Sequence, residues 1–472
     1  TEKNASMMDN LEFTTTQKNP GDVRMVFYNI IRQICKIKET MISSVVKLLR
    51  EEDVDEVFGI MSKRKRIYHA VPLIQLYLIQ VASCITDRAT VSRGINQGWL
   101  PITTSVKSSS YCETKSRLPE GSLKELAMRT GRSLEQCAQE RWTFVNRPVK
   151  VVDGTSVQLP DTPANQREYP QPKPQKEGCG FPVMNLSVLM GLESGGIIDM
   201  ETIAGTGYEH PLFRKLWRSL DPGDIVMGDK LYGSFAEVAL LRKMGVDCVF
   251  RAGTKKFKPE DAVELANGDW LYLWKRPKSP GEWIDADKLP ESILVRVIHA
   301  VIRRKGFRSK RITIYTTLLD PDEYPRSELL ELYRRRWEME LRLRDIKTTM
   351  GLEMLKSKTP SGCRKELWVG ILLYNLIRTI MLDAALRYKI CMSRLSHKGT
   401  LDRFSEMMNS WFIHVDPGIA YEILIRAIAQ DNNPYRPFRF EPRRIKRRPK
   451  NYRLLNIPRE IEHKLIEIGY IT

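Results

Sequence analysis

The chain has 472 residues, of which 42% are hydrophobic, enough to build several packed cores and to exclude a wholly disordered protein. Its 76 Lys and Arg residues outnumber its 57 Asp and Glu residues, which gives a formal net charge of +19. The length predicts two to four domains, and the charge favours a polyanion such as nucleic acid as partner.

No segment reads as a clean membrane span. The two most apolar segments, Val71–Ile85 and Leu367–Leu386, carry polar interruptions, and the opening segment Thr1–Asp22 is polar rather than a signal sequence. We therefore expect a cytoplasmic protein without membrane contact. The eight cysteines and six histidines are dispersed without zinc-site spacing, so any metal site must be built from carboxylates.

Residues 1–148 are predicted to form a helical N-terminal domain, with residues 1–22 poorly ordered. The stretch Gln97–Leu118 is rich in turn-forming and hydroxyl residues, a pattern that fits a DNA-binding module and a generic helical domain equally well. Apolar residues recur at three- and four-residue steps in Val23–Glu39, Ile42–Glu52, Val71–Cys84 and Ser122–Glu140.

From Pro148 the pattern changes to short strands and helices. The order β-β-β-α-β-α-β predicts an α/β fold built on a mixed sheet. The predicted elements are Val149–Leu159, a hairpin of Phe181–Leu192 with Gly196–Ile203, helix His210–Leu220, strand Asp224–Gly228, helix Ser234–Met244 and strand Val246–Arg251.

The segment 255–325 is irregular and β-rich, with strands predicted at Leu294–Arg303 and Arg311–Thr317. A long helix, Arg326–Met350, is predicted to end at Gly351, and helices Arg364–Tyr388 and Leu401–Gln430 follow.

The segment Tyr435–Arg453 is strongly basic. It holds nine Arg and Lys residues against one Glu, with aromatic residues and three prolines between the charges. Arginines bind phosphates and aromatic rings stack on bases, so the segment predicts nucleic-acid contact, the alternative being a solvated basic linker.

Two aspartates stand out by their position on predicted strands. Asp153 lies within the first strand, and Asp229 follows directly on the short strand Asp224–Gly228. Each one alone is more often a turn or helix-cap residue. On central strands of one sheet, however, the two carboxylates form a plausible metal pair.

The long helix carries a third carboxylate among cations. At about 100° per residue, Glu340 shares an arc of about 60° with Tyr333, Arg336 and Lys347. The helix extends about 21 Å between Tyr333 and Lys347, which suits several nucleotides of backbone. The alternative is an ordinary charged helix face with pairs such as Arg336 with Glu340. Three other carboxylates fall on the opposite side, namely Glu331, Glu338 and Asp345.

Three carboxylates from two strands and a helix are what a two-metal phosphoryl-transfer site requires, and Mg²⁺ or Mn²⁺ suits such ligands. The chain has no P-loop pattern, so we expect no nucleotide cofactor.

The spacing Tyr333-x2-Arg336-x3-Glu340-x6-Lys347 resembles the signature of bacterial insertion-sequence DDE transposases of the IS-four type, relatives of the Tn-five transposase. The motifs Asp153-Gly-Thr and Gly228-Asp229-x2-Tyr232 add to the resemblance, which covers about Val149 to Gly351.

The resemblance implies a ribonuclease H-like catalytic core at 149–254 and 326–390, interrupted by a β-rich insertion at 255–325. It further implies a helical DNA-binding domain at 1–148. The region 391–472, with its basic tail, would contact DNA and support dimerisation.

By the same resemblance, Asp153, Asp229 and Glu340 would be the catalytic triad that coordinates two Mg²⁺ ions, with Mn²⁺ able to substitute. The residues expected to grip the DNA are Tyr333, Arg336, Lys347 and Arg251.

The family activity implied is binding of terminal inverted repeats, cleavage of the ends and joining of the 3′-hydroxyl ends to target DNA. Cut-and-paste members form a hairpin intermediate. Members act on double-stranded DNA as homodimers in the bacterial cytoplasm, in association with the nucleoid.

One departure concerns stacking on a flipped base. Some relatives place a tryptophan on the insertion strand before the catalytic helix, whereas here Arg311–Thr317 has none. Tyr315 is one stacking candidate, and Trp270, Trp274 and Trp283 are others, although a plain core role is the commoner fate of such residues.

Two alternative functions remain open at this point. A ribonuclease H-like nuclease without strand transfer would share the carboxylates but not the Tyr-Arg-Glu-Lys spacing. A catalytically inactive, transposase-derived DNA-binding regulator would be free to lose a carboxylate, whereas this chain keeps all three.

Overall fold

The computed structural model describes residues 67–68, 70–139, 143–204, 209–252, 257–302, 310–407, 417–434 and 455–469. The segment predicted to be poorly ordered, residues 1–22, lies outside the described residues. So do the helices predicted at Val23–Glu39 and Ile42–Glu52, and the basic segment Tyr435–Arg453.

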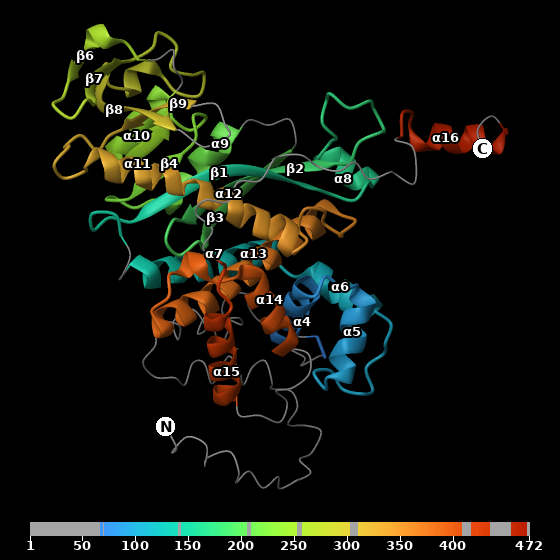
Figure 1. Ribbon diagram of the computed structural model, residues 1–472. Helices are drawn as coiled ribbons and strands as arrows, with labels where there is room; N and C mark the ends of the chain where they lie inside the picture. The colour runs from blue at the N-terminus through green and yellow to red at the C-terminus, as the bar shows by residue number, and fades with distance from the viewer. Residues whose placement is uncertain are drawn as a thin grey trace, which may run out of the picture.

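One mixed nine-stranded sheet runs through the described chain in the order β3-β2-β1-β4-β5-β9-β8-β7-β6 (Figure 1). β1 pairs antiparallel with β2 and parallel with β4, and β4 pairs parallel with β5. The predicted α/β class and mixed sheet are therefore confirmed. The strands are β1 (Val149–Gln158), β2 (Val183–Gly191), β3 (Ile197–Ala204), β4 (Ile225–Gly228), β5 (Asp247–Arg251), β6 (Ala262–Glu264), β7 (Trp270–Lys275), β8 (Ser292–Ile302) and β9 (Lys310–Thr316).

The β-rich segment 255–325 extends this sheet. Its last strand, β9, pairs antiparallel with β5, where Phe250 lies opposite Tyr315 and Arg251 opposite Ile314. The strands β6 to β8 then continue outward to the far edge. The segment is thus joined to the central strands by backbone hydrogen bonds.

Helices cover both faces of the central strands. α9 packs on β2 and β3, and α10 packs on β5, whereas α7 meets β3 and α12 meets β1. The α-helices are α4 (Ala70–Ala82), α5 (Asp87–Asn96), α6 (Ser109–Arg117), α7 (Glu120–Gln139), α8 (Pro163–Glu168), α9 (Glu209–Leu216), α10 (Phe235–Lys243), α11 (Arg326–Arg335), α12 (Trp337–Arg344), α13 (Pro360–Tyr388), α14 (His397–Met407), α15 (Pro417–Gln430) and α16 (Arg459–Glu467).

α13 is the central helix of the lower part of the molecule in Figure 1 and packs against α4, α7 and α15. By length and composition it could cross a membrane, but 94% of its most apolar window is buried inside the protein. Thr359 caps its first turn by accepting a hydrogen bond from the Gly362 amide at 3.2 Å, and Pro360 occupies a first-turn position where no amide donor is needed. We therefore interpret α13 as a core helix.

The polar residues inside α13 tie neighbouring elements to it. The Asn375 side-chain amide donates to the carbonyl oxygens of Ala127 on α7 and Ile197 on β3, both at 3.0 Å. Its side-chain oxygen accepts from the Ile197 amide at 2.8 Å. Gly131 permits this close approach, because a Cβ there would lie 1.8 Å from the Ile197 carbonyl oxygen. The helix α7 is thereby fastened to the sheet.

Several predicted boundaries need correction. The stretch Gln97–Leu118, noted for its turn-forming and hydroxyl residues, also contains the helix α6, in which Tyr111 is fully buried. The helix predicted over Leu401–Gln430 is two helices, α14 and α15, because a proline begins the second. The proposed domain boundaries stay predictions, although α7 shares its hydrophobic core with α13 and the sheet.

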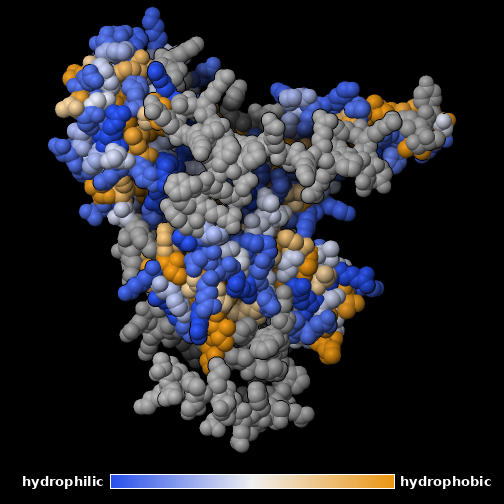
Figure 2. Space-filling model, viewed as in Figure 1, coloured by the Kyte–Doolittle hydropathy of each residue, from blue (hydrophilic) through white to orange (hydrophobic). Residues whose placement is uncertain are grey.

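The visible surface is largely hydrophilic, with apolar residues in separate patches (Figure 2). This distribution agrees with a chain of high net charge.

Candidate active site

The register of three parallel strands fixes the relative positions of Asp153, Asp229 and Arg251. The pairs Val151 with Met227 and Gly228 with Phe250 belong to the β1–β4 and β4–β5 ladders. Continuing each ladder sets Asp153 beside Asp229 and Asp229 beside Arg251. Residues two apart on a strand share a face, so the three side chains lie on the α12 face, to which the buried Val151 and Met227 also belong.

The predicted long helix runs over Arg326–Met350 but is not uniform. α11 and α12 meet at Arg336, where the Arg336 amide bonds the Tyr333 carbonyl at 3.1 Å in a tighter turn. A π-helical turn, η5 (Asp345–Thr349), follows and is closed by a bond from the Met350 amide to the Asp345 carbonyl at 2.9 Å. Gly351 then adopts a φ of +71°, as expected for a helix stop.

Arg336 joins the strand carboxylate to the helix carboxylate. Its Nη1 lies 3.5 Å from Oδ2 of Asp153, and its Nη2 donates to Oε1 of Glu340 at 2.8 Å. The side chains are partly shielded, with exposed fractions of 17% for Arg336, 20% for Asp153 and 36% for Glu340. The predicted proximity of Asp153 and Glu340 is thus present in the structure.

The electrostatics of Asp153 reflect its neighbours. Burial raises the pKa of Asp153 to about 6, and the negative charges of Asp229 and Glu340 add to the rise. Arg336 and a hydrogen bond from the Gly154 amide, 2.9 Å from Oδ1, oppose it. The three carboxylates therefore interact with one another, and the single positive charge of Arg336 does not balance their combined negative charge.

Tyr333 lies on the same side of the helix. Burial raises the pKa of its phenol, Asp229 contributes to the rise, and the charges of Arg336 and Arg251 oppose it. Asp229 and Arg336 thus act on both Asp153 and Tyr333, whereas Arg251 acts on Tyr333.

Lys347 stands apart from this group. It lies in η5, half-buried, seven residues beyond Glu340, which corresponds to about 10 Å along the helix. The structure does not bring its side chain to the carboxylates, in keeping with the expectation that the helix face extends beyond one metal pair.

The opposite side of the helix is occupied by a separate charge network. Arg335 binds Glu193 in the β2–β3 turn and Glu338, and Arg342 also binds Glu338, at 2.8 Å. Glu338 is thus committed to structural ion pairs. The prediction that Glu340, and not Glu338, faces the strand carboxylates is consistent with these contacts.

The donor set of the site decides whether a metal ion fits. Within the described ranges, no three His, Cys, Asp or Glu side chains are grouped as ligands of one ion, and Arg336 stands between Asp153 and Glu340. The chemistry nevertheless fits, because the site supplies three mutually repelling carboxylates with partial burial, which a divalent cation would stabilise.

The aromatic candidates divide by exposure. Trp274 and Tyr315 are buried and pack together in the core, with ring centroids 5.2 Å apart. Trp283 is 40% exposed and covered by the Arg214 guanidinium, 3.9 Å from its ring centre. Trp337, which is not among the residues predicted above, directly follows Arg336 and is 51% exposed. Its adjacency to the helix face was the signal available.

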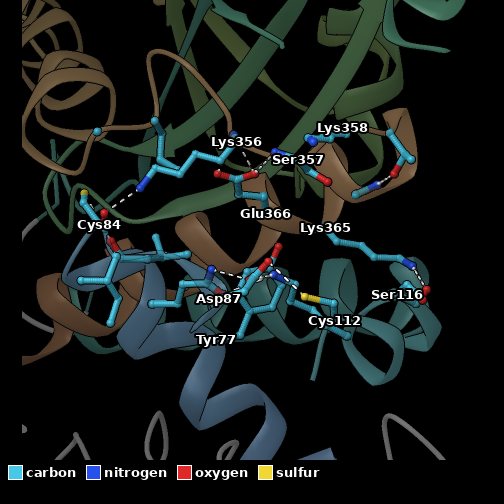
Figure 3. Close-up of a pocket in the computed structure, with 18 of the residues that line it drawn as sticks. Tyr77, Cys84, Asp87, Cys112, Ser116, Lys356, Ser357, Lys358, Lys365 and Glu366 are labelled. Carbon is cyan, nitrogen blue, oxygen red and sulfur yellow. Dashed lines mark hydrogen bonds and ion pairs between the residues drawn. The ribbon is translucent and has the colours of Figure 1, made fainter. Parts of the chain in front are cut away.

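A cavity of about 370 Å³ lies elsewhere, between α4, α6 and the start of α13 (Figure 3). Two of its lysines bond backbone carbonyls of the protein: Lys365 donates to the Ser116 carbonyl and Lys356 to the Cys84 carbonyl. Glu366 accepts from the amides of Lys356 and Ser357 at 3.0 Å. The cavity therefore lies where the N-terminal helices contact the end of the long helix. Asp153, Asp229 and Glu340 are not among the residues that line it.

Part of the chain is similar to known proteins. Residues 146–376 match the family described as transposase DDE domain. The chain is 27% identical over 238 residues to the transposase InsG for insertion sequence element IS4 of Escherichia coli (strain K12). This match spans 50% of the chain and 52% of the relative, so the chain covers about half the length of that protein.

A solved structure of a piggyBac transposase synaptic complex with hairpin DNA overlaps 86% of each chain. The identity is 9% and the TM-score 0.39, values too low to bear on the fold. The family match spans the strands that carry Asp153 and Asp229 and the helix that carries Glu340. Residues 146–376 therefore match a transposase DDE domain, and the resemblance of the chain to an IS4-type transposase is confirmed.

Proposed function

We propose that the chain is a Mg²⁺-dependent DNA transposase that binds the terminal inverted repeats of an insertion sequence, cleaves the ends and joins the 3′-hydroxyl ends to target DNA. The observation that carries the proposal is the meeting of Asp153, Asp229 and Glu340 within a family-matched domain. The chain's own site, rather than any single relative, is the basis for the proposal.

The central strands support a ribonuclease H-like core. Their order β3-β2-β1-β4-β5 combines an antiparallel hairpin with the parallel strands β1, β4 and β5. This arrangement places Asp153 on the central strand and Asp229 at the end of its parallel neighbour. Ligands commonly bind at such strand ends in open sheets.

In the proposed reaction, Asp153, Asp229 and Glu340 would hold two divalent cations, which activate the attacking hydroxyl and stabilise the leaving oxygen. Arg336, Arg251 and Tyr333 would orient the phosphate backbone beside the carboxylates, and Lys347 would hold it further along the helix. Arginine suits this role because its planar guanidinium can donate two hydrogen bonds to a phosphate.

Several finer features belong to the same proposal. The family resemblance supports a homodimer that synapses two ends, a hairpin intermediate on the cut-and-paste route and action at the bacterial nucleoid. Half-exposed Trp337, next to Arg336, is the aromatic side chain we assign to stacking on an unpaired base, since buried Trp274 and Tyr315 are occupied in the core.

The test is cleavage of a supercoiled plasmid that carries the two ends of the element, in the presence of Mg²⁺. Wild type should release the element, and Asp229→Ala should lose activity by about 100-fold or more, since even residues behind metal ligands contribute about 10–100-fold. The control is Glu331→Gln, an exposed carboxylate paired with Arg334. Equal release by Asp229→Ala and wild type would refute the site, and hairpin ends on the fragment would support the cut-and-paste route.

A further inference from the structure

Arg336, which we propose to hold DNA, contacts two of the proposed metal ligands in the structure. Its guanidinium contacts Asp153 at 3.5 Å and Glu340 at 2.8 Å, so both carboxylates share one cation. The same two carboxylates belong to the proposed metal ligands. Oxygen lone pairs that point at a guanidinium are not available to a metal ion in the same arrangement.

The position of Arg336 is set by the helix junction. Its backbone lies at the tightened turn between α11 and α12, where the Met339 amide bonds the Arg336 carbonyl at 3.0 Å. The guanidinium also bonds the buried Tyr333. Arg336 is therefore directed into the carboxylate group by local backbone geometry and by contacts on three sides.

The neighbouring cations of the helix are committed elsewhere. Arg334 pairs with exposed Glu331, and Arg335 and Arg342 pair with Glu338. The positive charge that balances Asp153 and Glu340 thus comes from Arg336. Removal of any of the other three would leave that balance unchanged.

We propose that Arg336 is a resident counter-cation that competes with divalent metal for Asp153 and Glu340. In this inference, which rests on the proposed function, Arg336 keeps the carboxylates paired until it transfers to a DNA phosphate, and the carboxylates then become free for metal. Arg336 is thus a positioning residue that weakens metal binding in the absence of DNA. The reciprocal consequence is that a phosphate which binds Arg336 strengthens metal binding, since the two equilibria are linked.

The experiment measures Mn²⁺ binding to the full chain without DNA, by electron paramagnetic resonance of free Mn²⁺. Arg336→Gln, which keeps a polar side chain but removes the charge, should tighten the Kd by about tenfold or more, because two unit charges at about 4 Å interact strongly even at an effective dielectric of about 20. Arg336→Lys, which keeps the charge but not the fork, should fall between Arg336→Gln and wild type.

The matched control is Arg334→Gln, two residues away on the opposite side of the helix and exposed, which should leave the Kd within about twofold, as expected of a surface ion pair. Circular dichroism verifies that each variant is folded, and Arg336→Lys provides the test if Arg336→Gln does not fold. An unchanged or weaker Kd in both Arg336 variants would overturn the counter-cation.

A separate variant distinguishes this inference from the proposed function. Asp229→Ala should abolish tight Mn²⁺ binding, because it removes a metal ligand without touching Arg336. If Asp229→Ala binds Mn²⁺ as wild type does, the metal site itself is wrong. If Asp229→Ala loses binding while the Arg336 variants match wild type, only the counter-cation is refuted.

Discussion

Asp153 on β1 and Glu340 on α12 bind the same guanidinium, although they come from distant parts of the chain. The contact brings a strand carboxylate and a helix carboxylate together with a single positive charge between them. The site is consequently rich in negative charge and partly shielded from water, a combination that opposes folding but favours cation binding.

The pH dependence of stability should report the ionisation of Asp153. Its pKa of about 6 lies above the ordinary value of 3.8, so the folded chain retains a proton that the unfolded chain releases between about pH 4 and 6. The free energy of unfolding therefore falls as the pH rises through this window, and the loss is complete above about pH 6.

Asp153→Asn removes this ionisation. At pH 8 the variant should be more stable than wild type by about 1–2 kcal/mol, a value discounted from the full shift for partial exposure to solvent. At pH 4 the two proteins should be nearly equal. Urea unfolding at both pH values measures the difference, and a gap that is the same at pH 4 and pH 8 would contradict the prediction.

A buried ion pair should hold the β-rich segment to the start of the long helix. Arg296 and Asp269 are fully buried, with Nε 2.9 Å from Oδ2, and Arg326 at the start of α11 reaches Oδ1 of Asp269 at 2.7 Å. Asp269→Ala leaves the buried Arg296 charge without a counter-ion and should lower the free energy of unfolding by about 3–5 kcal/mol.

The control for this prediction is Asp261→Ala, which removes a pair with exposed Lys275 on the same segment. That change should remain within about 1 kcal/mol. Denaturant titration of both variants is the measurement, and equal effects would contradict a special role for the buried pair.

Gly351 should resist substitution for two reasons. Its φ of +71° disfavours any Cβ, and a Cβ there would lie 3.0 Å from the Cys84 sulfur. Gly351→Ala should lower stability by about 1–2 kcal/mol. Cys84→Ala in the same chain removes only the steric part, so thermal unfolding of the double variant should show partial recovery, and full recovery would assign the effect to the contact alone.

The proposed DNA contacts should appear in the salt dependence of binding. Arg251→Ala and Lys347→Ala should each reduce the slope of log K against log salt by about 0.9, the value for one phosphate contact on duplex DNA. Fluorescence anisotropy with a labelled duplex measures the slope. Arg334→Ala, which alters the opposite side of the helix, should leave it unchanged, and a uniform effect of all three would contradict the assigned face.

Local patterns were sufficient for most of the elements. Alternation predicted β1, a glycine-bearing connection predicted the β2–β3 hairpin, and the short apolar run before Asp229 predicted β4. The order of strands and helices then predicted a mixed sheet. Such patterns arise because a strand or helix buries one of its faces, so that apolar residues recur at fixed steps. The recurrence can be recognised from residues that are close together in the sequence.

The errors arose where tertiary contacts override local signals. The hydroxyl-rich stretch around Tyr111 forms the helix α6 because Tyr111 is buried against the N-terminal helices. The partners of the polar residues in α13 were likewise not visible in the sequence: Asn375 satisfies buried backbone groups of α7 and β3. No local rule identifies a partner that lies far away in the chain.

By itself, the sequence determined the strand positions of Asp153 and Asp229, the helix face of Glu340 and the family resemblance. Only the tertiary structure decided that β9 closes onto β5, that Arg336 links Asp153 to Glu340, and that Trp274 and Tyr315 are core residues while Trp337 is exposed. Periodicity follows from short-range geometry, whereas burial and charge pairing depend on which distant segments pack together.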